Sequence, residues 1–117
     1  MKAMAPADLK ANSEASALAE RLRALAHPTR LRILTALGAS KTCQCGEIVR
    51  NLPLAQSTVS EHLRILLEAG LVRGETAGAR TCYCLDRNAV RKLAEDFDRL
   101  LAAIGRHEVA GGKARRA

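Results

Sequence analysis

The four cysteines of the chain form two pairs, and in each pair a single residue separates the two thiols. Cys43 and Cys45 lie in "TCQCG", and Cys82 and Cys84 lie in "TCYCL". Paired thiols can form disulfides, bind soft metal ions or react with oxidants. The amino terminus, MKAMAPADLK, has no hydrophobic signal core, so we expect a cytoplasmic protein. Structural disulfides are rare in that reducing compartment, which favours thiols, metal ligands or redox sensors.

Composition narrows the class of protein. The 117 residues suffice for one domain, and aromatic residues make up only 2% of them. Abundant Ala and Leu favour helices packed through aliphatic side chains. The formal net charge of +7 indicates a polyanionic partner such as double-stranded DNA, because Lys and Arg that neutralise phosphates release counterions. The apolar runs are too short to cross a bilayer, so we expect no membrane partner.

The spacing of apolar residues predicts a mainly α fold with one small β-hairpin, in the order α-α-α-α-β-β-α. The first four helices are expected at residues 11–26, 28–37, 43–51 and 56–69, with His27 as the cap before Pro28. The period then changes to two in "LVRGE" and "RTCYCL", which predict the strands of a hairpin. A final helix follows Asp86, its expected N-cap, and extends to residue 107.

The final helix carries a wide apolar face that so small a domain cannot fully cover. The residues on this face are Val90, Leu93, Phe97, Leu100, Leu101 and Ile104. The face indicates a homodimer interface, and the alternative is that the helix packs across its own domain. Residues 1–10 and the Gly-rich, basic residues 108–117 are predicted to be flexible, which leaves one domain at residues 11–107.

The third and fourth predicted helices have the proportions of a helix-turn-helix motif. Short polar side chains on the exposed side of the fourth helix can reach base edges, and an Arg there can reach a phosphate or a guanine. The hairpin that follows would be a wing lying against the DNA backbone or minor groove. The predicted DNA-binding residues are Gln56, Ser57, Thr58, Ser60, His62 and Arg64 on the helix, and Arg73 and Arg80 on the wing.

Three stretches of the chain resemble the ArsR/SmtB family of bacterial winged helix-turn-helix repressors. They are "LAHPTRLRILTAL", "LPLAQSTVSEHLRILLEAGLV" and the wing ending "CYCLD", and the resemblance covers about residues 15–105. It implies a homodimer built from the first and last helices, with the fourth helix in the major groove. It also implies a repressor that leaves its operator when an inducer binds.

The resemblance also suggests where an inducer binds. Family members that sense arsenite, cadmium or lead carry a C-x-C at the start of the helix before the recognition helix, and Cys43 and Cys45 match it. The arsenite version adds a third Cys where this chain has Ile48, and the cadmium and lead version uses cysteines of an N-terminal arm, which residues 1–42 lack. We expect no obligatory cofactor, and As(III) or a soft divalent metal as inducer. Cys82 and Cys84 are weaker candidates, and persulfide or peroxide is the alternative inducer of the same thiols.

The predicted elements set different geometries for the two pairs. Residues i and i+2 of a helix point about 200° apart, so chelation by Cys43 and Cys45 requires a distorted first turn. Cys82 and Cys84 share one face of a strand, and because Tyr83 and Leu85 have the character of packed residues, we expect both thiols to face outward or toward a neighbouring helix. A zinc site of all four cysteines requires the wing and the third segment to converge, which we do not expect within one subunit.

Other interpretations are less favoured. A second sensor location of the family lies between the last helices, where this chain offers Asp96, Asp98, His107 and Glu108 without the expected spacing. No α/β pattern surrounds the C-x-C pairs, so we expect no enzyme of the thiol oxidoreductase class. A winged-helix module with structural cysteines and no inducer stays open.

Overall fold

The computed structural model describes residues 6–46 and 52–106, which contain four helices and a two-stranded antiparallel hairpin. In chain order the elements are α1 (Pro6–Leu25), α2 (Pro28–Ala39), α4 (Gln56–Glu68), β1 (Val72–Ala77), β2 (Arg80–Leu85) and α5 (Arg87–Ile104). The mainly helical fold with a hairpin wing is confirmed. Of the predicted third helix, residues 47–51 lie outside the described residues, as do residues 1–5 and the predicted basic tail.

Two predicted helix caps are present. The Nδ1 atom of His27 accepts a hydrogen bond from the Thr29 amide at 3.0 Å, and Asp86 accepts one from the Ala89 amide at 3.0 Å. Each side chain satisfies an amide that the first helical turn leaves unpaired. The first helix begins at Pro6, earlier than the predicted Ala11.

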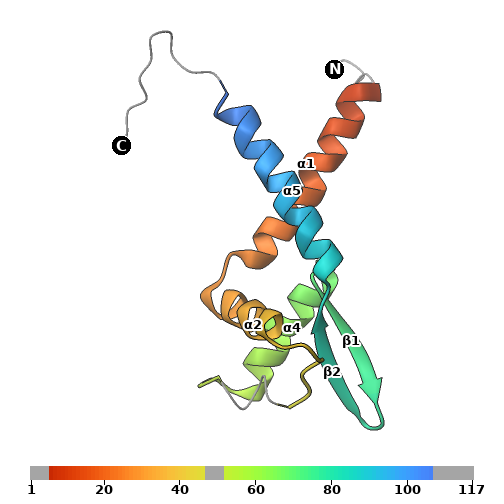
Figure 1. The fold of residues 1–117 in the computed structure, drawn as a ribbon, viewed down its shortest axis with the longest axis vertical. Helices are drawn as coiled ribbons and strands as arrows, with labels where there is room; N and C mark the ends of the chain where they lie inside the picture. Colours follow the sequence, from red (N-terminus) through yellow and green to blue (C-terminus); the bar gives the residue numbers. More distant parts are fainter. Residues whose placement is uncertain (1–5, 47–51, 107–117) are drawn as a thin grey trace.

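The helices α1 and α5 cross each other, and α2, α4 and the hairpin gather at one end of the crossed pair (Figure 1). The buried core lies at that end. It is built from Ile33 and Leu37 of α2, Val59, Leu63 and Leu66 of α4, Leu71 and Val72 at the start of the hairpin, and Leu93 of α5. This core fixes α4 against α2 and the hairpin, so the polar side of α4 and the wing are held in one unit.

A short extended segment lies beside the hairpin where a helix was predicted to begin. Gln44 pairs with Tyr83 of β2 in an antiparallel bridge, with both N–H···O distances at 2.8 Å. The predicted helical start at Cys43 is therefore wrong: residues 43–45 run along β2 as a minimal third strand. The backbone amide and carbonyl of Gln44 are satisfied by β2, which a first helical turn at this position could not provide.

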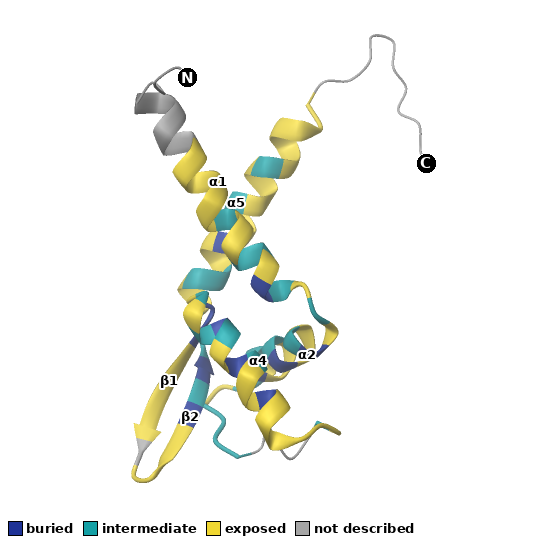
Figure 2. Ribbon diagram, turned by 180° about the vertical axis from the view of Figure 1, so that it is seen from behind, coloured by how far each residue is buried: buried dark blue, intermediate teal, exposed yellow. Residues whose placement is uncertain are grey.

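The outer half of α5 leaves apolar side chains uncovered. Phe97, Leu101 and Ile104 are 38%, 47% and 68% exposed, whereas Leu93 near the start of the helix is buried. Figure 2 shows the same trend, with mostly exposed residues along α5 beyond its crossing with α1. No helix among the described residues is long and apolar enough to cross a membrane.

Candidate nucleic-acid interface and cysteine cluster

Helix α4 presents a polar face opposite its buried side. Val59, Leu63 and Leu66 anchor the helix in the core. The predicted contact residues Gln56, Ser57, Thr58 and Ser60 are all exposed. The N-cap is Ala55, whose methyl group accepts no hydrogen bond, so side-chain capping does not occupy the first-turn amides. A helix end of this kind suits a phosphate, because its amides and dipole favour negative charge.

His62 does not lie on this face. It is half-buried, and its ring packs against that of His27 at a tilt of 44°, with the ring centroids 4.3 Å apart. Position 62 is three residues after Val59 and four before Leu66, so helical geometry places it at the edge of the buried stripe. The expected exposure of His62 is therefore wrong, and the imidazole joins α4 to the start of α2.

Arg64 is exposed, but its guanidinium is shared between two carboxylates. It forms ion pairs with Glu61 and with Glu68. The hydrogen bonds that Arg64 donates to Glu61 and then to Glu68 hold the pKa of Arg64 above its usual range. A phosphate would therefore have to displace these carboxylates, which makes Arg64 a weaker DNA ligand than its position alone suggests.

The wing carries the remaining predicted cations. Arg73 on β1 and Arg80 at the start of β2 are both exposed. Arg73 lies 3.8 Å from the Glu75 carboxylate, a surface pair that contributes little to stability. The structure therefore leaves both arginines in positions from which they can approach a polyanion.

The structure brings the four cysteines together. The Gln44–Tyr83 bridge sets Cys43 opposite Cys84 and Cys45 opposite Cys82, with Cα–Cα separations of 4.4 and 4.0 Å. Residues flanking a hydrogen-bonded pair form the closer, non-hydrogen-bonded pairs of an antiparallel ladder. Both pairs are joined as disulfides, so the expectation that the wing and the segment around Cys43 stay apart is wrong.

The hairpin cysteines lie on the predicted face of β2, but they are buried there. Cys82 and Cys84 are only 5% and 8% exposed, while Tyr83 and Leu85 are half-buried. Tyr83 and Leu85 pack against the core, so Cys82 and Cys84 lie on the opposite face of β2, where their disulfide partners Cys45 and Cys43 cover them. Since residues 43–45 are extended, Cys43 and Cys45 point to the same side of their segment, and no helical distortion is required.

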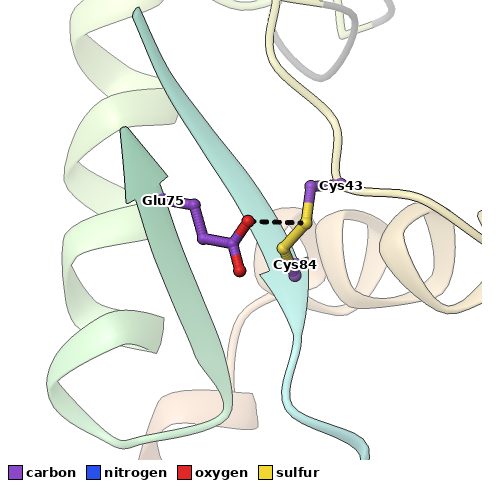
Figure 3. Close-up of side chains that lie close together, drawn as sticks. All are labelled: Cys43, Glu75 and Cys84. Carbon is purple, nitrogen blue, oxygen red and sulfur yellow. Dashed lines mark hydrogen bonds between the residues drawn. A yellow bond between two sulfur atoms is a disulfide. The ribbon is translucent and has the colours of Figure 1, made fainter. Parts of the chain in front are cut away.

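The sequence holds a signal for this arrangement. "TCQC" and "TCYC" share the same alternating pattern of cysteines. When two such segments pair as antiparallel strands, each cysteine lies opposite a cysteine of the other segment. Glu75, by contrast, was absent from the predicted site. Its Oε1 atom lies 3.6 Å from the Cys43 sulfur (Figure 3). A disulfide sulfur has no proton to donate, so this contact becomes a hydrogen bond only in the thiol form.

The two cysteine pairs differ in their surroundings. An open pocket of about 450 Å³ is lined by Cys43 and Cys84, with Lys41, Arg73 and Arg87 around them. Cys45 and Cys82 are absent from its lining. A small reagent in this pocket would therefore meet the Cys43–Cys84 pair first.

The alternative carboxylate site on the last helix is not assembled among the described residues. Asp96 accepts hydrogen bonds from Lys92 at 2.9 Å and from Arg99 at 3.1 Å, and Lys92 holds the pKa of that carboxyl below its usual range. Asp98 is exposed, while His107 and Glu108 lie outside the described residues. Asp96 is thus a surface carboxylate paired with cations of its own helix.

Comparison with known proteins identifies relatives over much of the chain. A family model described as a helix-turn-helix domain matches residues 25–75. The HTH-type transcriptional regulator CmtR of Mycobacterium tuberculosis is 43% identical over 88 residues, which cover 74% of each chain. The HTH-type transcriptional repressor SmtB of the same species is 45% identical over 69 residues, or 59% of this chain and 50% of SmtB.

A solved structure shares the fold. The homodimeric winged helix-turn-helix DNA-binding domain of a "possible ArsR-family transcriptional regulator" from Mycobacterium bovis matches with a TM-score of 0.60. The match covers 93% of this chain and 98% of that domain at 22% sequence identity. At this identity the likeness concerns the fold: helices and hairpin occur in the same arrangement.

Proposed function

The chain belongs to the ArsR/SmtB family of helix-turn-helix transcriptional regulators, which are not enzymes, and on that premise we propose that it is an operator-binding repressor controlled by its cysteine pairs. The exposed polar face of α4 supports DNA reading in the major groove. The wing arginines and the net charge of +7 support contact with the phosphate backbone.

The repressor acts as a homodimer through α1 and α5. Phe97, Leu101 and Ile104 form an apolar stripe at i, i+4 and i+7 spacing that the protomer does not cover. A dimer would present two α4 helices to half-sites about one helical turn, roughly 34–36 Å, apart. Any change in the relative position of the two α4 helices therefore changes operator affinity.

The observation that carries the regulatory part of the proposal is the pairing of Cys43 with Cys84 and of Cys45 with Cys82. Each oxidation removes two electrons and two protons from a dithiol, and a peroxide oxidant takes them up to form water or an alcohol. The bonds tie residues 43–45, which follow α2, to the wing strand. Reduction releases that tie, and operator binding belongs to the reduced form.

A coupling free energy of about 1–3 kcal/mol, a roughly 5- to 150-fold change in affinity, is enough for derepression. Soft metal ions or As(III) are the second candidate class of inducer. Two thiols beside an open pocket favour it, since thiolates are the preferred ligands of soft metals.

The test measures operator affinity in the reduced and the peroxide-treated protein. A DNA fragment selected from a random library serves as the operator, and salt is held constant because affinity depends steeply on it. We expect oxidation to weaken binding at least 5-fold in the wild type. A variant with all four cysteines changed to Ser should bind equally well under both conditions. If the wild type binds the operator equally well before and after peroxide treatment, and its affinity does not change when arsenite or Cd²⁺ is added, the protein is an inducer-independent module.

A further inference from the structure

We propose that the reduced protein binds a divalent cation of borderline softness, such as Zn²⁺ or Cd²⁺, through Cys43, Cys84 and Glu75. The inference rests on the proposed function, because it names the ligands of an inducer at the same cysteines. One donor atom from each of the three side chains lies within 4.8 Å of the other two. They come from the extended segment, β2 and β1, and Figure 3 shows the carboxylate directed at the sulfur pair.

The spacing of sulfur and oxygen suits tetrahedral coordination. Bonds of about 2.3 Å to sulfur and about 2.1 Å to oxygen, at the tetrahedral angle, place the two ligand atoms about 3.6 Å apart. The separation between Cys43 Sγ and Glu75 Oε1 is 3.6 Å. The two sulfurs must be about 3.8 Å apart by the same geometry, so the disulfide has to be reduced before the ion can bind.

Reduction and metal binding follow a balanced sequence. A dithiol reductant gives two electrons and two protons to the Cys43–Cys84 disulfide and is itself oxidised to a disulfide. The cation then displaces both thiol protons to solvent as it binds the two thiolates. Since a sulfur in a disulfide has no thiolate to offer, a bound ion and the Cys43–Cys84 disulfide exclude each other.

Charge favours a divalent ion in this site. Two thiolates and one carboxylate would carry three negative charges within a few ångströms, a repulsive arrangement without a cation. Arg73, 3.8 Å from Glu75, and the pocket residues Lys41 and Arg87 offset part of this charge, whereas a bound divalent ion offsets it at the donor atoms themselves. The pocket beside Cys43 and Cys84 gives the ion a path of entry and room for a water molecule as fourth ligand.

The oxygen donor separates this site from one for As(III). Carboxylate oxygen is a hard ligand that Zn²⁺ accepts readily, whereas soft ions such as As(III) favour sulfur. Glu75 therefore selects for the divalent class, and its loss should affect Cd²⁺ and Zn²⁺ more than arsenite.

The test compares Cd²⁺ binding by the reduced full-length wild type, the Glu75→Gln variant and the Cys43→Ser/Cys84→Ser variant, without oxygen. The ultraviolet thiolate-to-cadmium charge-transfer band reports Cd–S bonds, and competition with a chelator gives affinity. Glu95→Gln, which removes an exposed carboxylate of α5, is the matched control. Circular dichroism checks that each variant folds.

We expect one Cd²⁺ per Cys43–Cys84 pair, with affinity unchanged in Glu95→Gln. Glu75→Gln should keep the charge-transfer band. Its affinity for Cd²⁺ should fall by at least the roughly 10- to 100-fold that removal of an outer-shell partner costs. Cys43→Ser/Cys84→Ser should lose the band of this site. Equal Cd²⁺ affinity in wild type and Glu75→Gln overturns the inference. Peroxide-driven release from the operator requires no carboxylate, so it persists in Glu75→Gln and fails only if the proposed function itself is wrong.

Discussion

His62 is a half-buried titratable residue at the contact between α4 and the start of α2. Its Nδ1 atom is buried without a hydrogen-bond partner among the described residues, and its ring packs at a tilt against His27, whose own Nδ1 caps α2. Protonation here therefore strains the contact between α2 and α4, the DNA-reading helix.

The stability of the protein should depend on the ionisation of His62. Burial, followed by the nearby charges of His27 and Arg30, holds the pKa of His62 below its usual value of 6.5, and Glu61 opposes the shift. The unfolded chain then binds more protons than the folded one just below pH 6.5. The free energy of unfolding should therefore fall as pH drops below about 6.5, until the lower folded pKa is passed.

Urea unfolding at several pH values and one protein concentration measures this dependence. His62→Gln removes the titrating group, so its stability should vary less between pH 7.5 and 5.5 than that of the wild type. Identical pH dependence in the two proteins would contradict the assignment.

At the scale of elements, the two disulfides depend on the pairing of residues 43–45 with β2, which consists of a single bridge between Gln44 and Tyr83. The apolar stripes of α1, α2, α4 and α5 could be predicted because each is a local, periodic feature of the sequence. The Gln44–Tyr83 bridge was missed, because it is a long-range backbone pairing whose one signal in the sequence is the shared alternation of "TCQC" and "TCYC". The placement of Cys43 on a helix was wrong for the same reason.

His62 and Glu75 mark the two limits of prediction for the site. The exposure of Gln56, Ser57, Thr58 and Ser60 followed directly from the helical period of α4. The burial of His62 could have been inferred from its spacing to Val59 and Leu66. The approach of Glu75 to Cys43 could not, since it spans β2 and requires the register of both neighbouring segments.

At the scale of the whole molecule, α5 carries the exposed apolar residues Phe97, Leu101 and Ile104 on its part away from the DNA-reading end, where Figure 2 shows mostly exposed residues. Burial of such a surface contributes about 25 cal/mol per Å², and large hydrophobic side chains at the centre of an interface dominate its energy. This surface therefore determines both the association of two protomers and the spacing of their α4 helices.

Changing Leu101 and Ile104 together to Asp should separate the dimer. Both side chains are about half exposed or more, so the change costs the fold of a protomer little. We expect a shift to monomer in analytical ultracentrifugation and a loss of operator affinity of at least 10-fold. Glu95→Gln on the same helix is the control and should remain dimeric. A double variant that stays dimeric would place the interface elsewhere.

The most direct test of the account compares two variants that keep two cysteines each. Cys45→Ser/Cys82→Ser keeps the cross-strand pair Cys43 and Cys84, whereas Cys82→Ser/Cys84→Ser keeps the C-x-C pair Cys43 and Cys45. Operator affinity is measured for both after reduction and after peroxide treatment, with mass spectrometry confirming the disulfides. The account predicts that oxidation weakens DNA binding at least 5-fold in the first variant and leaves the second unchanged. A switch that survives only in the C-x-C variant would contradict it.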